Sequence, residues 1–333
     1  MTKGFVFGKF YPFHKGHEGL IHFALGKCDH LAILICCSDQ EKIDGKTRKE
    51  WIENTFLNHP NISILVYNYS EQDLPNTSES SLYVSEKWSA VFKELLPDCE
   101  RIFTSEAYGK YVANFMKIQS IDFDIARILY PISATLLRQN IFDYWDYLPG
   151  SVKNYFTIKV VLLGTESTGK TTLTQALAKY YNGTPVTEAA REIISNSNSF
   201  EMTELQQVAI DHAKNINESV SKGRPLIIID TDIHITLSYA HFSLNESLEV
   251  DSFIYDSNKA HLYLYLSKDF PFSQDGTRLE ESKRNLLDES HRKTLKKHNI
   301  PYIEINGDWN ERFKSCIEKI DDYMLQHQHV LLG

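Results

Sequence analysis

Cysteine is scarce in this 333-residue chain, and its five copies form no CxxC pair and no regular spacing. A disulfide framework and a thiolate metal site both need such spacing, so the sequence predicts neither of them. Cys36 and Cys37 lie inside an apolar run, which is typical of small buried residues in a strand. Unpaired thiols of this kind fit a reducing compartment, and we predict a cytoplasmic protein.

Long apolar runs and an excess of positive charge are lacking as well. No stretch approaches the roughly 20 apolar residues that span a bilayer, and the first residues form no signal peptide of useful length. The formal net charge is -9, whereas nucleic acids and anionic membranes attract positive charge, so we predict neither as a partner. Nucleotide substrates remain compatible, because a few local donors can hold them. The oligomeric state stays open, and a homo-oligomer is compatible with the sequence.

The chain does contain two successive series of alternating strand-like and helix-like segments, and it is long enough for two cores. This alternation predicts right-handed βαβ units and an α/β fold of two doubly wound parallel-sheet domains. We place a Rossmann-like domain at residues 1–152, a P-loop domain at 153–333, and a linker at 148–151. The predicted strands are 5–7, 31–37, 62–67, 101–104 and 127–132, then 157–163, 226–229, 261–266 and 302–305. The predicted helices are 17–27, 47–57 and 83–96, then 170–181, 203–221, 278–298 and 311–326.

The segment GKFYPFHKGH, residues 8–17, joins the first predicted strand to the first predicted helix. Free backbone N–H groups at such a junction attract phosphate, and Gly8 permits close approach of a nucleotide. His14 and His17 lie about one helical turn apart, so their imidazoles could stabilise charge that builds on an α-phosphate under attack. The alternative is a pair of capping or surface histidines. The nucleotide-binding residues expected here are Gly8, Lys9 and Phe10.

The segment GTESTGKTT, residues 164–172, matches the pattern G-x-x-x-x-G-K-[ST] between a buried strand and a helix. Its backbone N–H groups would hold the β-phosphate, Lys170 would bridge the β- and γ-phosphates, and the Thr171 hydroxyl would bind Mg²⁺. The expected nucleotide-binding residues are Gly164, Ser167, Thr168, Gly169, Lys170, Thr171 and Thr172.

Acidic and basic residues follow other predicted strands of the second domain. Asp230 or Asp232 could hold Mg²⁺ or bind a substrate hydroxyl, unless they only cap the next helix. Glu188 could accept a substrate hydroxyl and Arg191 could contact phosphate, although a plain helix start would look the same. Arg278, with Lys283 and Arg284 beyond it, is typical of a basic lid over the γ-phosphate. A solvated helix whose charges pair with each other is the alternative there.

The first motif resembles the G-x-F-x-P-x-H-x-G-H signature of the nucleotidylyltransferase superfamily, whose members join a nucleotide to a phosphorylated acceptor and release pyrophosphate. The second signature, I-S-x-T-x-x-R, is matched by residues 132–138, directly after the strand predicted at 127–132. Ser133 is placed to cap the following helix. The resemblance adds Thr135 to the nucleotide site and implies that the permanently charged Arg138 reaches the triphosphate.

The order of all these features resembles one bifunctional family, the NadR-type nicotinamide-mononucleotide adenylyltransferase and ribosylnicotinamide kinase. Residues 103–109, 131–149, 188–192 and 230–232 also look like that family, so the resemblance covers nearly the whole chain. It implies a kinase that uses ATP and Mg²⁺ to convert ribosylnicotinamide to nicotinamide mononucleotide, with Lys170, Arg278 and either Asp230 or Glu188 in its site. It also implies an adenylyltransferase that converts the mononucleotide and ATP to NAD and pyrophosphate.

Two departures from the family pattern accompany the resemblance. The tryptophan that often precedes the Asp-Gly-x-Arg lid is missing, so Phe272 or a nearby tyrosine would have to stack on the substrate. The chain also begins directly at the first strand, without the helix-turn-helix that some members carry. Trp88 is a second candidate for base stacking, with core packing as its alternative. The rival functions are transfer to another phosphorylated acceptor and a catalytically silent nucleotide sensor.

Overall fold

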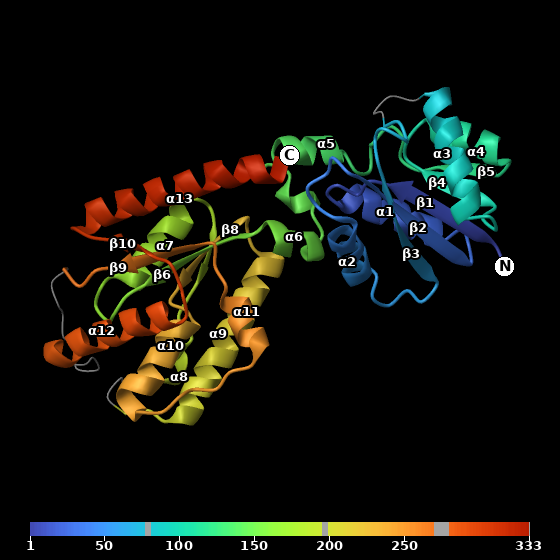
Figure 1. Ribbon diagram of the computed structural model, residues 1–333. Helices are drawn as coiled ribbons and strands as arrows, with labels where there is room; N and C mark the ends of the chain where they lie inside the picture. The colour runs from blue at the N-terminus through green and yellow to red at the C-terminus, as the bar shows by residue number, and fades with distance from the viewer. Residues whose placement is uncertain (77–80, 195–198, 270–279, 333) are drawn as a thin grey trace. The chain divides into compact units, whose positions relative to one another are not determined.

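The computed structural model describes residues 1–333 except 77–80, 195–198, 270–279 and 333, with side chains described as far as residue 326 (Figure 1). The chain divides into two compact units, of which the first contains Met1–Tyr155 and the second is Phe156–Gln328. The division falls within helix α6 (Gly150–Phe156), part of which we predicted as a linker loop. Val152 and Phe156 are both buried, and this i, i+4 spacing puts them on one face of a helix.

The first unit contains a five-stranded parallel sheet in the order β3-β2-β1-β4-β5. Strand β1 lies at its centre, and the chain leaves β1 in both directions across the sheet. In open parallel sheets, ligands bind at the carboxyl end of such a switch-point strand, which here is Gly8. The strands are β1 (Lys3–Gly8), β2 (His30–Ser38), β3 (Ile62–Tyr69), β4 (Arg101–Thr104) and β5 (Gln119–Asp122).

Six helices and one 3₁₀ turn are described in this unit: α1 (Lys15–Leu25), α2 (Gly45–Thr55), α3 (Leu82–Leu95), α4 (Gly109–Met116), α5 (Ala134–Gln139), η1 (Trp145–Tyr147) and α6. Helix α3 presents Trp88 and Phe92 to the sheet, where the ring of Phe92 lies 4.4 Å from that of Phe7. Trp88 is 8% exposed and donates its indole N–H to Pro75 O. It therefore packs in the core, as the alternative reading of this residue required.

The strand predicted at residues 127–132 is wrong. The last strand is β5, and the apolar residues that follow it form a loop in which Ile128 and Leu129 are 82% and 67% exposed. The Asp124 carboxylate accepts the backbone N–H groups of Ile128, Leu129 and Tyr130, and Arg127 has φ 53°. A side chain that binds three consecutive backbone N–H groups replaces the ladder that a strand would need.

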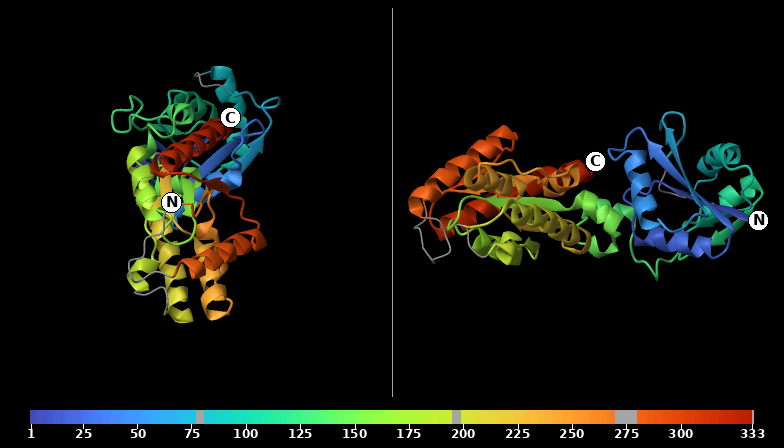
Figure 2. Two further views of the ribbon diagram at one scale, coloured as in Figure 1. Left: turned by 90° about the vertical axis from the view of Figure 1, so that its left-hand side faces the viewer. Right: turned by 90° about the horizontal axis from the view of Figure 1, so that it is seen from below.

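The second unit has a parallel sheet in the order β10-β9-β6-β8-β7, with β6 at the centre and Gly164 after its carboxyl end. The strands are β6 (Ile158–Leu163), β7 (Thr184–Val186), β8 (Leu226–Asp230), β9 (Leu262–Leu266) and β10 (Ile303–Ile305). Helices cover both faces (Figures 1 and 2). They are α7 (Lys170–Tyr180), α8 (Ala190–Ile193), α9 (Met202–Lys222), α10 (Ile233–Tyr239), π-helical η2 (Ala240–Leu244), α11 (Ser252–Asn258), α12 (Glu281–Lys297) and α13 (Trp309–Leu332). Both sheets are thus of the doubly wound class that the sequence predicts.

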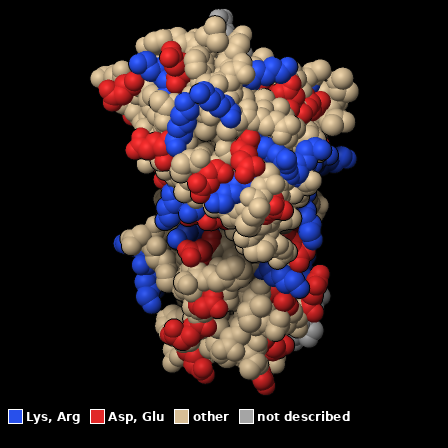
Figure 3. Space-filling view, turned by 90° about the vertical axis from the view of Figure 1, so that its right-hand side faces the viewer, with Lys and Arg blue, Asp and Glu red and all other residues tan. Residues whose placement is uncertain are grey.

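Across the described residues, every helix is too short or too polar to cross a bilayer. On the face drawn in Figure 3, basic and acidic side chains are interspersed. This face therefore carries no extended patch of positive charge, as expected for an acidic protein.

Candidate functional sites

The first site is the turn between β1 and α1. His14 is the N-cap of α1, and its Nδ1 accepts the backbone N–H of Gly16 at 3.1 Å. Because Nδ1 accepts, the proton of the neutral ring lies on Nε2. The cap therefore holds the His14 imidazole with one N–H available for a phosphate oxygen at the helix N-terminus.

His14 and His17 lie side by side, as their spacing predicts, with ring centroids 3.7 Å apart and 21° between the planes. Phe10, which has φ 49° and is 2% exposed, packs its ring 4.9 Å from His17. Burial, then His17 and Arg127, holds the pKa of His14 well below its usual range. Burial and then Arg127 lower the pKa of His17 to about 3. Both imidazoles are therefore neutral hydrogen-bond donors at pH 7, and the edge-to-face contact with Phe10 supports His17.

These pKa shifts predict an acid sensitivity of the first domain. Unfolded His17 takes up a proton below about pH 6.5 and folded His17 only near pH 3, so the unfolded state binds more protons in between. The free energy of unfolding therefore falls as the pH drops through this window, by about 2 kcal/mol at pH 5 from this residue. Denaturant unfolding at pH 7 and pH 5 measures the loss. His17→Gln should lose less free energy of unfolding than the native chain between these pH values. His22→Gln, at an exposed position, should lose as much as the native chain. Equal losses in all three proteins would contradict the assignment.

Arg138 joins the two signatures of this domain. Ser133 caps α5 by accepting the N–H of Leu136 at 3.2 Å, which confirms that prediction. One turn later, Arg138 donates Nη1 to Tyr11 O at 2.7 Å and Nη2 to Thr135 Oγ1 at 3.3 Å. The guanidinium is thereby held at the turn that carries the two histidines, although the two segments are far apart in the sequence.

A buried ion network beneath this turn was not predicted from the sequence. Arg48 is fully buried, donates to Lys9 O at 3.0 Å, and lies over the Tyr11 ring at 4.6 Å. The Glu41 carboxylate forms ion pairs with Arg48 Nη1 at 2.6 Å and with the Lys9 ammonium at 2.7 Å. In the sequence, Arg48 belongs to a charged helix start that is typical of a surface. Only the turn folding over it shows that it supports residues 9–11.

The second site is the loop between β6 and α7. Gly164 has φ 138°, and a Cβ there would lie 2.7 Å from Leu266 O, while Gly169 has φ 86°, so both positions require glycine. Thr168 Oγ1 donates to Thr165 O at 2.8 Å. The Lys170 ammonium reaches back across the loop to Gly164 O and Thr165 O at 2.8 and 3.1 Å. The two glycines and the lysine at the start of α7 are the features of a phosphate-binding loop.

Two strand ends bring acidic groups to this loop. Thr171, at the start of α7, donates its hydroxyl to an Asp230 carboxylate oxygen and accepts from Arg191 Nη2 at 2.6 Å. The other Asp230 oxygen, Oδ1, is buried with no hydrogen-bond partner in the described structure. A hydroxyl beside a carboxylate with a spare oxygen fits Mg²⁺, which needs few protein ligands when phosphates supply the rest. No group of three or more metal-ligating side chains was found among the described residues.

The carboxylates of Glu188 and Asp232 differ in their hydrogen-bond partners and in their basicity. Asp232 is buried, caps α10 through the His234 N–H at 3.0 Å, and accepts His234 Nδ1 at 2.6 Å. Glu188 follows β7, and Arg191 Nε lies 3.8 Å from its carboxylate. Burial raises the pKa of Glu188, Lys170 opposes that shift, and Asp230 adds to it. Asp232 is therefore tied to the helix start, whereas Glu188 is a carboxylate of increased basicity on which the charge of Lys170 acts.

Two buried arginines, Arg284 and Arg312, contact the phosphate loop in a way that the sequence did not predict. Arg284, predicted in the lid, is instead buried and donates Nε to Glu166 O in the phosphate loop at 2.9 Å. Arg312, for which the sequence predicted no role, donates Nη1 to Thr168 O in the same loop at 2.7 Å. Both brace loop carbonyls, and no local pattern marks them as different from surface arginines. Arg278 and Phe272 lie outside the described residues, so their predicted roles stay predictions.

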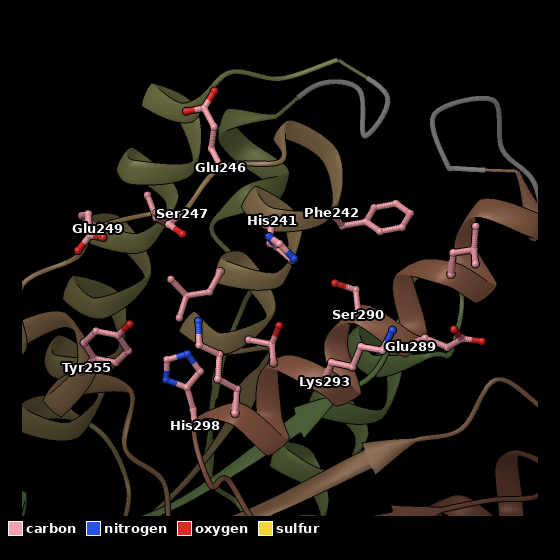
Figure 4. A pocket seen from close by; sticks show the side chains of 15 residues that line it. His241, Phe242, Glu246, Ser247, Glu249, Tyr255, Glu289, Ser290, Lys293 and His298 are labelled. Carbon is pink, nitrogen blue, oxygen red and sulfur yellow. The ribbon is translucent and has the colours of Figure 1, made fainter.

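A separate pocket of about 660 Å³ lies between η2 and α12 in the second unit (Figure 4). Glu246 and Glu249 lie at one side and Lys293 at another. It contains none of the predicted site residues. Its lining residues are Leu237, His241, Phe242, Glu246, Ser247, Leu248, Glu249, Tyr255, Leu286, Glu289, Ser290, Lys293, Thr294, Lys297 and His298.

Known proteins match the chain over both units. A family model described as an AAA domain matches residues 159–312. The trifunctional NAD biosynthesis/regulator proteins NadR of Salmonella typhimurium and Escherichia coli are each 29% identical to it, covering 96% and 97% of this chain and 83% of theirs. Crystal structures of NadR protein in complex with NR, and with NAD and AMP-PNP, superpose with TM-scores of 0.66 and 0.63. Each is 19% identical and covers 97% of this chain and 96% of its own. The match therefore extends along nearly the entire chain.

Proposed function

Because the chain is related to the NadR proteins over nearly its whole length, we propose that it is a bifunctional transferase of NAD salvage. The second domain phosphorylates ribosylnicotinamide with ATP, and the first joins the resulting nicotinamide mononucleotide to the AMP of a second ATP. The observation that carries the proposal is the pair of phosphate-binding turns, one at the central strand of each sheet. All five cysteines are free thiols, so we place the reactions in the cytoplasm.

In the kinase domain, phosphoryl transfer needs positioning and charge neutralisation more than covalent chemistry. The loop amides and Lys170 bind the β- and γ-phosphates of ATP. The 5′-hydroxyl oxygen attacks the γ-phosphorus, the bond from that phosphorus to the β–γ bridging oxygen breaks, and ADP leaves. Glu188 accepts the hydroxyl proton, since burial raises its pKa. Asp230 remains beside Thr171. We assign the Mg²⁺ site to these two residues, and the ion, when bound, neutralises phosphate charge.

In the adenylyltransferase domain, the phosphate of the mononucleotide is already an anionic nucleophile. It attacks the α-phosphorus of ATP, the bond to the β-phosphate breaks, and pyrophosphate leaves. His14 and His17 donate neutral N–H groups to the oxygens that gain charge, and Arg138 neutralises the departing pyrophosphate. No covalent enzyme intermediate is needed, because binding both anions in line supplies most of the acceleration.

The test of this function is incubation of the purified protein with ATP, Mg²⁺ and ribosylnicotinamide, followed by separation of products. The mononucleotide should appear first and NAD with pyrophosphate second, and EDTA should stop both. A panel of other phosphorylated acceptors tests the alternative acceptor, which the similarity to NadR proteins does not favour. Tight nucleotide binding without any product would instead revive the silent sensor.

A further inference from the structure

The turn that carries Asp230 and Asp232 contains a strained residue. Thr231, which lies between them, has φ 69°, a region that β-branched residues rarely adopt. It is 4% exposed, and its Oγ1 has no hydrogen-bond partner in the described structure. Such a conformation persists only where surrounding contacts enforce it, and strained residues gather at functional sites.

Thr231, the residue with the left-handed backbone, lies between two aspartates that have different roles. The Thr231 N–H still bonds to Leu162 O at 3.0 Å, so β8 remains paired with β6 up to this point. Asp230 faces Thr171 on one side, and Asp232 immediately caps α10 on the other. With Thr231 in an extended conformation, the strand would continue and α10 could not begin at residue 233. The backbone of Thr231 therefore connects the strand end that carries Asp230 to the helix start that Asp232 caps.

His212, on α9, holds that backbone. Its Nε2 lies 3.2 Å from Thr231 O, and because a carbonyl only accepts, Nε2 must carry the proton. The ring is 4% exposed, and burial lowers its pKa, so it is neutral at pH 7. The other ring nitrogen, Nδ1, has no hydrogen-bond partner in the part of the chain that the structure describes. The hydrogen bond to Thr231 O is thus the one that the geometry of the ring defines, and the backbone of Thr187 also acts on the imidazole.

We propose that His212 is a positioning residue of the kinase site, which acts by holding Thr231 in its left-handed conformation and so keeps Asp230 against Thr171. The inference rests on the proposed kinase function. His212 is not one of the residues proposed to bind ATP or the acceptor. It nevertheless affects the Mg²⁺ site through its hydrogen bond to the carbonyl of Thr231. Nothing in the sequence distinguishes His212 from other core residues of an amphipathic helix.

The experiment is a double-mutant cycle between residues 212 and 231. His212→Phe keeps the ring volume and removes the donor, so kcat for ribosylnicotinamide should fall on the order of tenfold, with a higher half-saturating Mg²⁺ concentration. Thr231→Gly should be close to native, because glycine adopts positive φ without support. The double variant should recover most of the lost kcat and Mg²⁺ affinity. Adenylylation of the mononucleotide serves as the internal standard and should stay constant.

Two results would overturn the inference: a native kcat and Mg²⁺ dependence in His212→Phe, or no recovery in the double variant, as expected if the ring only fills space. If His212→Phe does not fold, His212→Gln, whose amide can donate, should retain more activity than His212→Leu. Mg²⁺-dependent binding of AMP-PNP is measured in parallel on every variant. A native chain that binds AMP-PNP but phosphorylates nothing would refute the kinase function, while this binding cycle would still test His212.

Discussion

Replacing Lys170 with alanine is expected to lower phosphorylation of ribosylnicotinamide by about 10³-fold. The ammonium lies at the edge of the loop formed by residues 164–169, where it now bonds two loop carbonyls and would turn to the β- and γ-phosphates. Alanine removes the only positive charge in the segment 164–172. Adenylylation of added nicotinamide mononucleotide should stay within about twofold of native, because that reaction uses a different triphosphate site.

Initial rates of both half-reactions, assayed separately with saturating ATP and Mg²⁺, check this prediction. Lys179→Ala is the matched control: this exposed lysine lies in the last turn of the same helix and should leave both rates unchanged. If Lys170→Ala removed both activities together, the division of labour between the domains would be wrong. If it removed neither, the loop would not be the kinase site.

The residues that touch phosphate in this proposal could be predicted from the sequence, because a phosphate-binding turn is a local structure. The turn 164–169 needs glycine at defined positions and a helix directly behind it, and these requirements are visible over nine residues. The same holds for His14, which caps the helix that it precedes. The alternation of strands and helices predicts the doubly wound class of both sheets, but the order of their strands comes from the structure.

The supporting residues could not be predicted, because their roles depend on contacts between distant segments. Arg48, Arg284 and Arg312 each donate to backbone carbonyls of a turn that is distant in sequence, and each is buried. In the sequence they lie in charged helices, where an exposed arginine would look identical. The strand predicted at 127–132 was wrong for a related reason. A single side chain, Asp124, binds the backbone of this segment, and its hydrogen bonds outweigh the apolar composition of residues 128–132.

Replacing His17 with alanine is the reciprocal prediction for the first domain. Adenylylation should fall by about 10²- to 10³-fold, the usual loss for one preorganised donor to a developing oxyanion. The loss should be large because His17 is held by its stack on His14 and by the Phe10 ring, and neither neighbour can take its place. Kinase activity should persist.

A single incubation with ATP, Mg²⁺ and ribosylnicotinamide makes the division visible. The His17→Ala protein should accumulate nicotinamide mononucleotide and release little pyrophosphate, whereas the native chain carries the same material on to NAD. His22→Ala, an exposed position one turn and a half further along α1, should behave as native. Undiminished pyrophosphate release from His17→Ala would show that transfer does not occur at this turn. If nicotinamide mononucleotide did not accumulate, the two activities would not be separable. Two independent phosphate-binding turns require that they are.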